Sequence, residues 1–217
     1  MKTADAREAV AAAYRDLGRR GLIVGSAGNV SVRTRKGMAI TPSGGNPDRA
    51  RPADVVPVTL DGVASGDGTP SSEWAMHAAI YKTKPDAGCI VHTHADACTA
   101  LACLNEGLPP FHYMVLAFGG GDVRCAPYVT FGTAALADLA AEAMTDRSAC
   151  LLANHGMIVC GRDVGAAIAN AILLETLCRQ YLLARSVGAP RLLNAEEIAG
   201  ARERFKNYGP HAEKKRS

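Results

Sequence analysis

Three histidines occupy positions from which their side chains could meet around one metal ion. His92 and His94 follow the apolar run 89–91, and alternate residues of an extended chain point to the same side. His155 lies in the segment 154–156, between two apolar runs that we expect to form strands. Imidazole suits zinc, and three protein ligands leave a position open for water or substrate. The spacing therefore favours a catalytic metal site, whereas each histidine taken alone is equally typical of a polar turn.

Glu73 is the candidate carboxylate of this site. It follows Pro70-Ser71-Ser72 at the start of an expected helix, where an acidic side chain also stabilises the helix dipole. Its functional interpretation is a carboxylate directed at the metal, either as a ligand or as a proton acceptor. His77, one helical turn later, competes with it by spacing. We interpret His77, His112 and His211 instead as surface histidines or as histidines with satisfied hydrogen bonds.

Three loops combine small residues with hydroxyl side chains, a composition suited to binding an anion. They cover residues 25–29, 41–45 and 70–72. Glycine lets backbone N–H groups approach a ligand closely, and the third loop precedes a helix N-terminus, which favours phosphate. Each loop alone is most often a simple turn, and none matches a nucleotide-binding P-loop. The assignment therefore depends on the pattern that the three loops complete together.

The elements that would position these residues alternate irregularly between helix and strand. Hydrophobic periodicity predicts helices over residues 5–18, 72–84, 95–104, 133–144, 163–185 and 195–206. Strands are expected over residues 29–34, 38–41, 55–60, 88–92, 149–153 and 157–160. Residues 105–128 contain too many prolines and glycines for a firm assignment. The pattern predicts an α/β fold, a single three-layer α/β/α domain over residues 1–217 with a mainly antiparallel or mixed central sheet, and a flexible tail over 209–217.

Composition excludes several classes of protein. Of 217 residues, 48% are hydrophobic and 21% are charged, as in globular domains and unlike disordered or fibrous chains. The net charge of +3 is small, and the basic run 214–216 stands at the end of the sequence, so we expect no nucleic-acid partner. No apolar stretch is long enough for a membrane span. Seven cysteines without a C-x-x-C motif and the lack of a signal peptide predict a cytoplasmic protein with reduced thiols.

In this order along the chain, the motifs resemble the class II aldolase/adducin family, most closely its fuculose-phosphate aldolase branch. The likeness extends from about Gly21 to Tyr208. It is carried by SAGNVS at 26–31, ITPSG at 40–44, PSSEW at 70–74, VHTH at 91–94, HYM at 112–114, CAPYVTFGT at 125–133 and NHG at 154–156.

The resemblance implies roles for individual residues. It implies one zinc ion per subunit, held by Glu73, His92, His94 and His155. It implies a substrate phosphate held by Asn29, Ser43, Gly44, Ser71 and Ser72, with Gly28 shaping the first loop. It also implies a homotetramer with active sites at subunit interfaces, in which Tyr113 enters from the neighbouring subunit as a proton donor and Tyr208 closes over the site.

The activity implied by the resemblance is reversible cleavage of a ketose 1-phosphate, of the fuculose-1-phosphate type, to dihydroxyacetone phosphate and an aldehyde. Zinc, or another divalent first-row metal, stabilises the enediolate as a Lewis acid. Glu73 moves the proton at the enediolate carbon, and Tyr113 acts on the aldehyde oxygen. Zinc takes the place of a Schiff-base lysine, so Lys82 and Lys84 are interpreted as surface charges.

Other branches of the family leave alternatives open. These are salvage aldolases for 5-deoxy- or 5-methylthio-pentulose 1-phosphates, L-ribulose-5-phosphate 4-epimerases, decarboxylases of phosphorylated oxo-acids and adducin-like assembly modules. The intact histidine set argues against the last, which lacks the metal ligands. The chain departs from the family pattern at two places. Asp122 and Arg124 add charges in a glycine-rich loop near Tyr113, where we consider them candidates for lining the aldehyde half of the substrate pocket. Asn154 stands where some relatives have a second histidine, so His155 is the only metal ligand expected in that segment.

Overall fold

The computed structural model describes residues 1–205 and contains one seven-stranded mixed sheet. The strand order is β3-β2-β1-β4-β7-β6-β5, and every neighbouring pair is antiparallel except β5 and β6. The strands are β1 (Gly28–Thr34), β2 (Gly37–Ile40), β3 (Val56–Val58), β4 (Cys89–Thr93), β5 (Cys125–Ala126), β6 (Ala149–Leu152) and β7 (Gly156–Gly161). Tyr208 and the expected tail at 209–217 lie outside the described residues.

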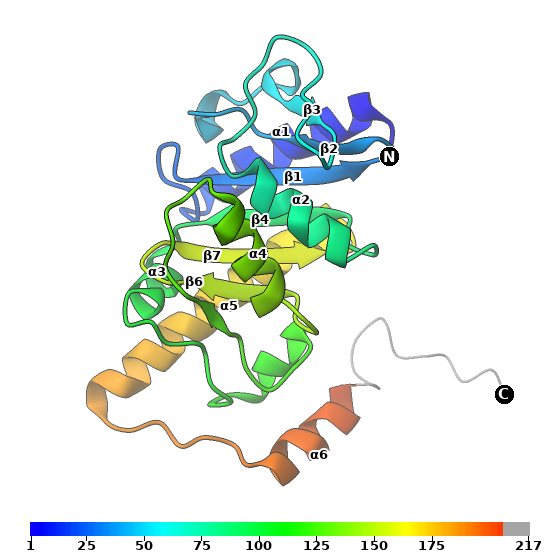
Figure 1. The fold of residues 1–217 in the computed structure, drawn as a ribbon. Coiled ribbons are helices and arrows are strands. Elements are labelled where there is room, and N and C mark those ends of the chain that lie inside the picture. Colours follow the sequence, from blue (N-terminus) through cyan, green and yellow to red (C-terminus); the bar gives the residue numbers. More distant parts are fainter. Residues whose placement is uncertain (206–217) are drawn as a thin grey trace, which may run out of the picture.

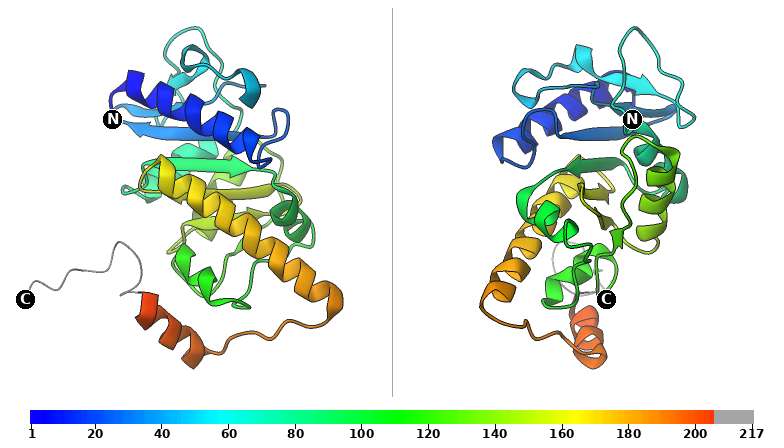
Figure 2. Two further views of the ribbon diagram at one scale, coloured as in Figure 1. Left: turned by 180° about the vertical axis from the view of Figure 1, so that it is seen from behind. Right: turned by 60° about the vertical axis from the view of Figure 1, so that its left-hand side comes forward.

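Helices cover both faces of the sheet and complete three layers (Figures 1 and 2). One face carries α1 (Thr3–Arg19), α3 (Asp96–Ala102) and α5 (Val164–Val187). The opposite face carries α2 (Trp74–Thr83) and α4 (Ala134–Ala143), which pack against each other. A further helix, α6 (Ala195–Phe205), contacts the 3₁₀ helix Tyr113–Phe118. The predicted α/β/α architecture with a mixed sheet is therefore confirmed.

Alternation along the strands divides the interior into two apolar clusters. In β4, Val91 faces the cluster beneath α1, α3 and α5, whereas Ile90 faces the cluster beneath α2 and α4. The same alternation holds in β7 for Val159 and Ile158. Because successive side chains of a strand point to opposite faces, His92 follows Ile90 toward α2. Register therefore determines which layer receives the functional side chains.

The expected elements are present, with boundaries shifted by a few residues. The strand expected over 55–60 is shorter, because chain pairing with β2 extends only over Val56–Val58. The unassigned region 105–128 contains the 3₁₀ helix and the short strand β5. Asp163 caps α5 through a hydrogen bond from the Ala166 N–H to its side chain, as the sequence predicts. Among residues 1–205, none of the helices has both the length and the apolar character needed to cross a bilayer.

Glu175 fixes the start of α3, just beyond His94. This buried carboxylate accepts hydrogen bonds from the backbone N–H groups of Ala97 and Cys98, both at 2.9 Å. A glutamine amide has one acceptor oxygen and would direct its NH₂ group at the second donor. We expect Glu175→Gln to lower the free energy of unfolding by about 1–3 kcal/mol, the cost of an unsatisfied buried donor. Urea denaturation measures this, and an unchanged midpoint would contradict the assigned capping role.

Candidate active site

The three histidines come from two neighbouring strand ends. His92 is the penultimate residue of β4, and His94 follows that strand directly. His155 lies in the hairpin between β6 and β7, where its N–H bonds to the Leu152 carbonyl. The turn is possible because Asn154 adopts a left-handed backbone with φ of 53°, a conformation that asparagine tolerates better than most residues. Since β4 pairs with β7, the hairpin brings His155 beside the other two.

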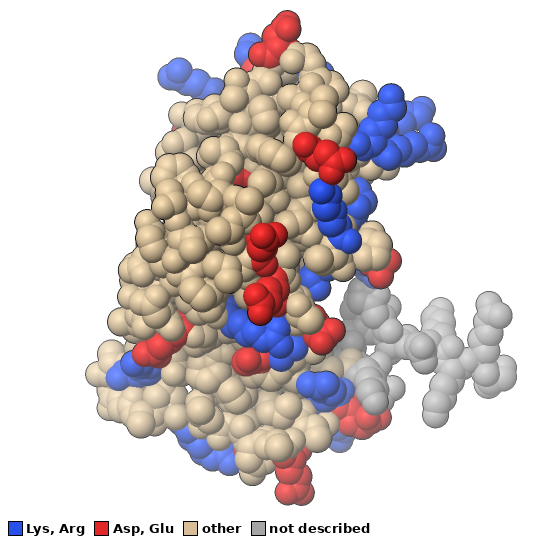
Figure 3. All heavy atoms as spheres, viewed as in Figure 1, with Lys and Arg blue, Asp and Glu red and all other residues tan. Residues whose placement is uncertain are grey.

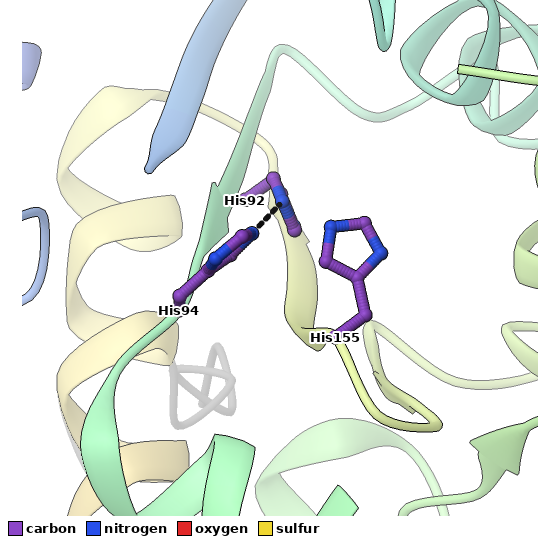
Figure 4. Close-up of side chains that lie close together, drawn as sticks. All are labelled: His92, His94 and His155. Atoms are coloured by element: carbon purple, nitrogen blue, oxygen red, sulfur yellow. Dashed lines mark hydrogen bonds between the residues drawn. The ribbon is translucent and has the colours of Figure 1, made fainter. Parts of the chain in front are cut away.

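The imidazoles converge through their Nε2 atoms (Figure 4). The Nε2 atoms of His92 and His94 lie 3.1 Å apart, and the available ring nitrogens of all three histidines lie within 4.8 Å of one another. The ring centroids are 4.8–5.0 Å apart. His92 Nδ1 is 2.8 Å from the Met157 carbonyl, so Nδ1 carries the proton and donates. His92 Nε2 is therefore the nitrogen that remains for a metal, and it faces the other rings.

Glu73 completes the cluster from the helical layer. It immediately precedes α2, and its N–H bonds to Ser71 Oγ at 3.3 Å. Its Oε2 lies 3.1 Å from His92 Nε2 and accepts a hydrogen bond from the Asn29 amide at 2.9 Å. Its Oε1 lies 3.3 Å from His155 Nε2 but has no hydrogen-bond partner, although it is buried. One carboxylate oxygen is thus held by a neutral donor, and the other faces the imidazoles without a partner.

Burial and mutual interaction set the protonation of these groups. Burial, reinforced by the electrostatic influence of the neighbouring His92, lowers the pKa of His94 and His155 to about 4, against the opposing effect of Glu73. Burial alone would raise the pKa of Glu73, but His92, His155 and the Asn29 amide outweigh it and hold that pKa well below its usual range. At neutral pH, His94 and His155 are therefore neutral with free lone pairs, and Glu73 is a carboxylate.

The donor set fits a divalent first-row metal. Two nitrogen ligands bound tetrahedrally to zinc at ~2.05 Å lie about 3.3 Å apart, close to the 3.1 Å between His92 and His94. A cation at this point would also satisfy Glu73 Oε1, which is otherwise a buried acceptor without a donor. Neutral imidazoles with one carboxylate are the ligands that zinc prefers. The side chains present therefore fit a metal centre.

A cavity of about 390 Å³ opens beside this cluster. It is lined by residues from both sides of the site: Ser26, Ala27, Gly28, Ser72, Glu73, His94, Tyr128, Val129, Phe131, Asn154 and His155. Gly28 has a φ of 140°, and a Cβ there would lie 2.8 Å from the His92 carbonyl. Only glycine lets the 25–29 loop approach β4 this closely. The predicted loop residue Gly28 and the predicted hydroxyl Ser72 are thus brought to the histidines.

The other predicted phosphate residues do not line this cavity directly. Asn29 and Ser71 are buried behind it and contact Glu73. Ser43 and Gly44 line a neighbouring cavity of about 650 Å³. Their loop is held against the 69–72 segment by hydrogen bonds from Ser43 N to Thr69 O and from Ser71 N to Thr41 O, both at 3.0 Å. The structure therefore divides the predicted set between the metal-facing cavity and an adjacent loop.

Three residues considered for the substrate end of the site do not line this cavity. Tyr113 is 49% exposed and stacks on His112, with ring centroids 4.7 Å apart. Asp122 pairs with Arg147 at 2.6 Å, and Arg124 donates to the carbonyl groups of Ala143 and Thr145 at the end of α4. Asp122 and Arg124 thus both have structural partners within the chain.

Two features of the site were not predicted from the sequence: the aromatic lining of the cavity and the complete burial of His77. Tyr128, Val129 and Phe131 line the cavity, and the aromatic pair within the 125–133 motif was the available signal. His77 is fully buried rather than on the helix surface, and it lies 2.6 Å from Asn29 and 2.7 Å from Ser31. Its interpretation as a satisfied histidine is correct. Burial lowers its pKa to about 3, so the ring is neutral.

Gly156 gives a first test of how tightly the site is packed. A Cβ at this position would lie 2.5 Å from the Thr93 carbonyl and 3.1 Å from the His94 ring. We expect Gly156→Ala to displace His94 and to weaken metal binding by about 10- to 100-fold, as for other changes that disturb ligand orientation. A competition assay with a chromophoric chelator measures the affinity. Gly200→Ala, at a site with open space, is the control, and equal affinity in both variants would contradict the prediction.

Comparison with known proteins places the chain in a family. Residues 8–182 match the family model "Class II Aldolase and Adducin N-terminal domain". The chain is 47% identical over 193 residues to a 5-methylthioribulose-1-phosphate/5-deoxyribulose-1-phosphate aldolase of Rhodospirillum rubrum. This match covers 89% of this chain and 87% of that protein. It is 42% identical over 195 residues to an L-fuculose phosphate aldolase of Escherichia coli, with coverage of 89% and 91%.

A solved structure gives the same result for the fold. An L-fuculose 1-phosphate aldolase superimposes with a TM-score of 0.88 and 39% identity, over 93% of this chain and 96% of that chain. The sequence match, the shared fold and the converging histidines agree. The chain therefore belongs to the class II aldolase and adducin family, as one of its metal-dependent aldolases.

Proposed function

We propose that this chain is a zinc-dependent aldolase that reversibly cleaves a ketose 1-phosphate to dihydroxyacetone phosphate and an aldehyde. The observation that carries the proposal is the convergence of three imidazoles, two of which lie 3.1 and 3.3 Å from the Glu73 carboxylate, at the wall of a cavity that is also lined by Gly28 and Ser72. The ligands would be His92, His94, His155 and Glu73. When bound, the metal supplies Lewis-acid stabilisation of the negative charge on the three-carbon fragment.

The protein's own residues would bind the substrate and move protons. The phosphate would be held by Asn29, Ser43, Gly44, Ser71 and Ser72, with Gly28 shaping the loop. In the direction of addition, Glu73, whose low pKa keeps it ionised, would take a proton from the carbon next to the carbonyl of dihydroxyacetone phosphate. The electron pair left on that carbon would form the new bond to the aldehyde carbon, and Tyr113 would donate a proton to the aldehyde oxygen. Cleavage reverses these steps: Tyr113 would take back the hydroxyl proton as the carbon–carbon bond breaks, and protonated Glu73 would return its proton to the three-carbon fragment.

Hydrogen exchange in dihydroxyacetone phosphate tests this function most directly. Zinc-loaded protein in heavy water is expected to replace one hydrogen at the carbon next to the carbonyl, without any aldehyde present. The same preparation is analysed for metal content, expected near one zinc per chain. Binding without exchange would remove Glu73 from its proposed role, and failure to bind this triose phosphate would favour the epimerase or decarboxylase branches.

The identity of the aldehyde is a separate question, and one alternative substrate class has its own support. The relative from Rhodospirillum rubrum acts on 5-deoxy- and 5-methylthio-ribulose 1-phosphates. The cavity offers apolar surface from Val129 and Phe131, which suits a methyl or methylthio end. We therefore propose comparing kcat/KM for fuculose 1-phosphate, 5-deoxyribulose 1-phosphate and 5-methylthioribulose 1-phosphate. The substrate with the highest value identifies the branch.

We also propose a cytoplasmic homotetramer with interfacial active sites. Tyr113, Tyr128 and Phe131 are 49%, 60% and 65% exposed in the single chain, and large exposed aromatic groups are typical of interfaces. The left edge of the molecule in Figure 3, where the β6–β7 hairpin lies in Figure 1, shows few charged side chains. Seven free cysteines fit a reducing compartment. Light scattering on the purified protein measures the assembly, and a monomer would contradict the role given to Tyr113.

A further inference from the structure

A buried row of polar side chains connects the sheet with Glu73. Asn29 and Ser31 lie two residues apart on β1, so both face α2, where His77 is fully buried. His77 Nδ1 lies 2.7 Å from Ser31 Oγ, and His77 Nε2 lies 2.6 Å from Asn29 Oδ1. The Asn29 amide in turn donates to Glu73 Oε2 at 2.9 Å. Each polar group of the row contacts the next, and the row ends at the carboxylate.

The direction of these hydrogen bonds follows from donor and acceptor chemistry. An ionised carboxylate only accepts, so Asn29 must present its NH₂ group to Glu73 and its Oδ1 to His77. His77 Nε2 must then carry the proton and donate. A neutral imidazole has its lone pair on the other nitrogen, so Ser31 Oγ donates its single proton to His77 Nδ1 at 2.7 Å rather than to the Tyr81 hydroxyl 3.0 Å away. All three donors therefore point toward Glu73.

We propose that His77 is a positioning residue, which holds the Asn29 amide with its N–H toward Glu73 and so determines which carboxylate oxygen is free. The inference rests on the role proposed above for Glu73. Asn29 has an amide that could rotate by 180° and present its oxygen to the carboxylate. A rotated amide would repel Glu73 and remove its only neutral donor among the described residues. The His77 N–H, already directed at Asn29 Oδ1, opposes that rotation.

The two oxygens of Glu73 are unequal as a result. Oε2 is tied to Asn29, whereas the buried Oε1 has no hydrogen-bond partner. A carboxylate anchored through one oxygen keeps the other at a fixed point beside the imidazoles. His77 thus acts through Asn29 on the geometry of the site, without contacting the substrate. Residues that orient ligating groups in this way typically change metal affinity or activity by about 10- to 100-fold when replaced.

Two isosteric replacements separate this role from simple packing. Glutamine places an amide near the Nε2 position of histidine and can donate to Asn29 Oδ1. Asparagine places its amide near the Nδ1 position, where it can pair with Ser31 but cannot reach Asn29. We expect His77→Asn to lower kcat and zinc affinity by about 10- to 100-fold, with KM little changed, and His77→Gln to recover most of both. Equal losses in the two variants, or no loss in either, would overturn the proposal.

Tyr81→Phe controls for stability. The Tyr81 hydroxyl contacts the Ser31 end of the row, farthest from Glu73: it donates to the Ser31 carbonyl at 3.0 Å and lies 3.0 Å from Ser31 Oγ. Its removal is expected to lower the thermal midpoint without lowering kcat. If instead kcat fell in proportion to the loss of stability in Tyr81→Phe and in both His77 variants, a merely structural role would explain His77.

The tautomer of His77 gives a readout that needs no substrate. Nitrogen-15 NMR of the zinc-loaded protein is expected to show the proton of His77 on Nε2, and a proton on Nδ1 would overturn the proposal. Zinc affinity, measured by chelator competition, likewise requires no catalysis. If the wild-type protein fails to exchange hydrogen in dihydroxyacetone phosphate, the proposed function fails, while these two measurements still decide the role of His77.

Discussion

Replacing His92 by asparagine is expected to remove the bound metal and the aldolase activity together. Asparagine can keep the hydrogen bond to the Met157 carbonyl, which His92 makes through Nδ1, but it has no atom at the Nε2 position where the donors converge. Loss of Lewis-acid stabilisation costs several kcal/mol, and about 4 kcal/mol corresponds to roughly a thousandfold in rate. Metal content by mass spectrometry and kcat under zinc-saturated conditions are the two measurements.

The same substitution at His112 is the matched control. His112 accepts a hydrogen bond from Met114 N–H through Nδ1, which asparagine can also accept, and His112 does not line the cavity beside Glu73. We expect His112→Asn to retain a full complement of metal. A His92→Asn protein that still bound zinc at one ion per chain, or that turned over at the wild-type rate, would rule out the three-histidine site.

Replacing Glu73 by glutamine is expected to separate metal binding from proton transfer. Glutamine keeps an oxygen that can accept from Asn29 and face the imidazoles, but it cannot take up a proton at neutral pH. General acid–base catalysis contributes about a hundredfold to ten-thousandfold, so we expect hydrogen exchange in dihydroxyacetone phosphate to slow by roughly a thousandfold. Zinc should remain bound. Deuterium incorporation followed by NMR gives the exchange rate.

Glu175→Gln provides the comparison for this second prediction. It replaces another buried carboxylate by its amide, in a position that caps α3 rather than facing the cavity. It should reduce stability while leaving the exchange rate per folded molecule close to that of the wild type. Exchange at an undiminished rate in Glu73→Gln would transfer the proton-moving role to another group.

The metal-facing part of the site was predictable because local periodicity in the sequence determines where its side chains point. His92 and His94 share one side through strand alternation, and a histidine between two apolar strands had to occupy the turn that joins them. Glu73 was identifiable as the residue at a helix start. For these three segments, the sequence determines where each side chain points, and the resemblance to a known family determines that they belong together.

The remaining features depend on contacts between distant segments. The burial of His77 follows from the packing of α2 against β1, which periodicity within α2 alone does not reveal. The division of the phosphate residues follows from how the 41–45 loop folds against the 69–72 segment. Asp122 was considered for the substrate pocket, yet its partner Arg147 lies 25 residues away in sequence. Each of these outcomes required the relative placement of elements, for which the sequence carries no short-range signal.

The position of β4 at the centre of the sheet has a consequence for how the protein is synthesised. This strand pairs with β1, whose residues precede it by more than fifty positions, and with β7, which ends at Gly161. Pairings between such distant segments are slow to form. During synthesis on the ribosome, β4, the strand that contains His92, therefore cannot pair with β7 until about residue 161 has left the exit tunnel. Until then the nascent chain has an open strand edge, which makes it a natural substrate for chaperones.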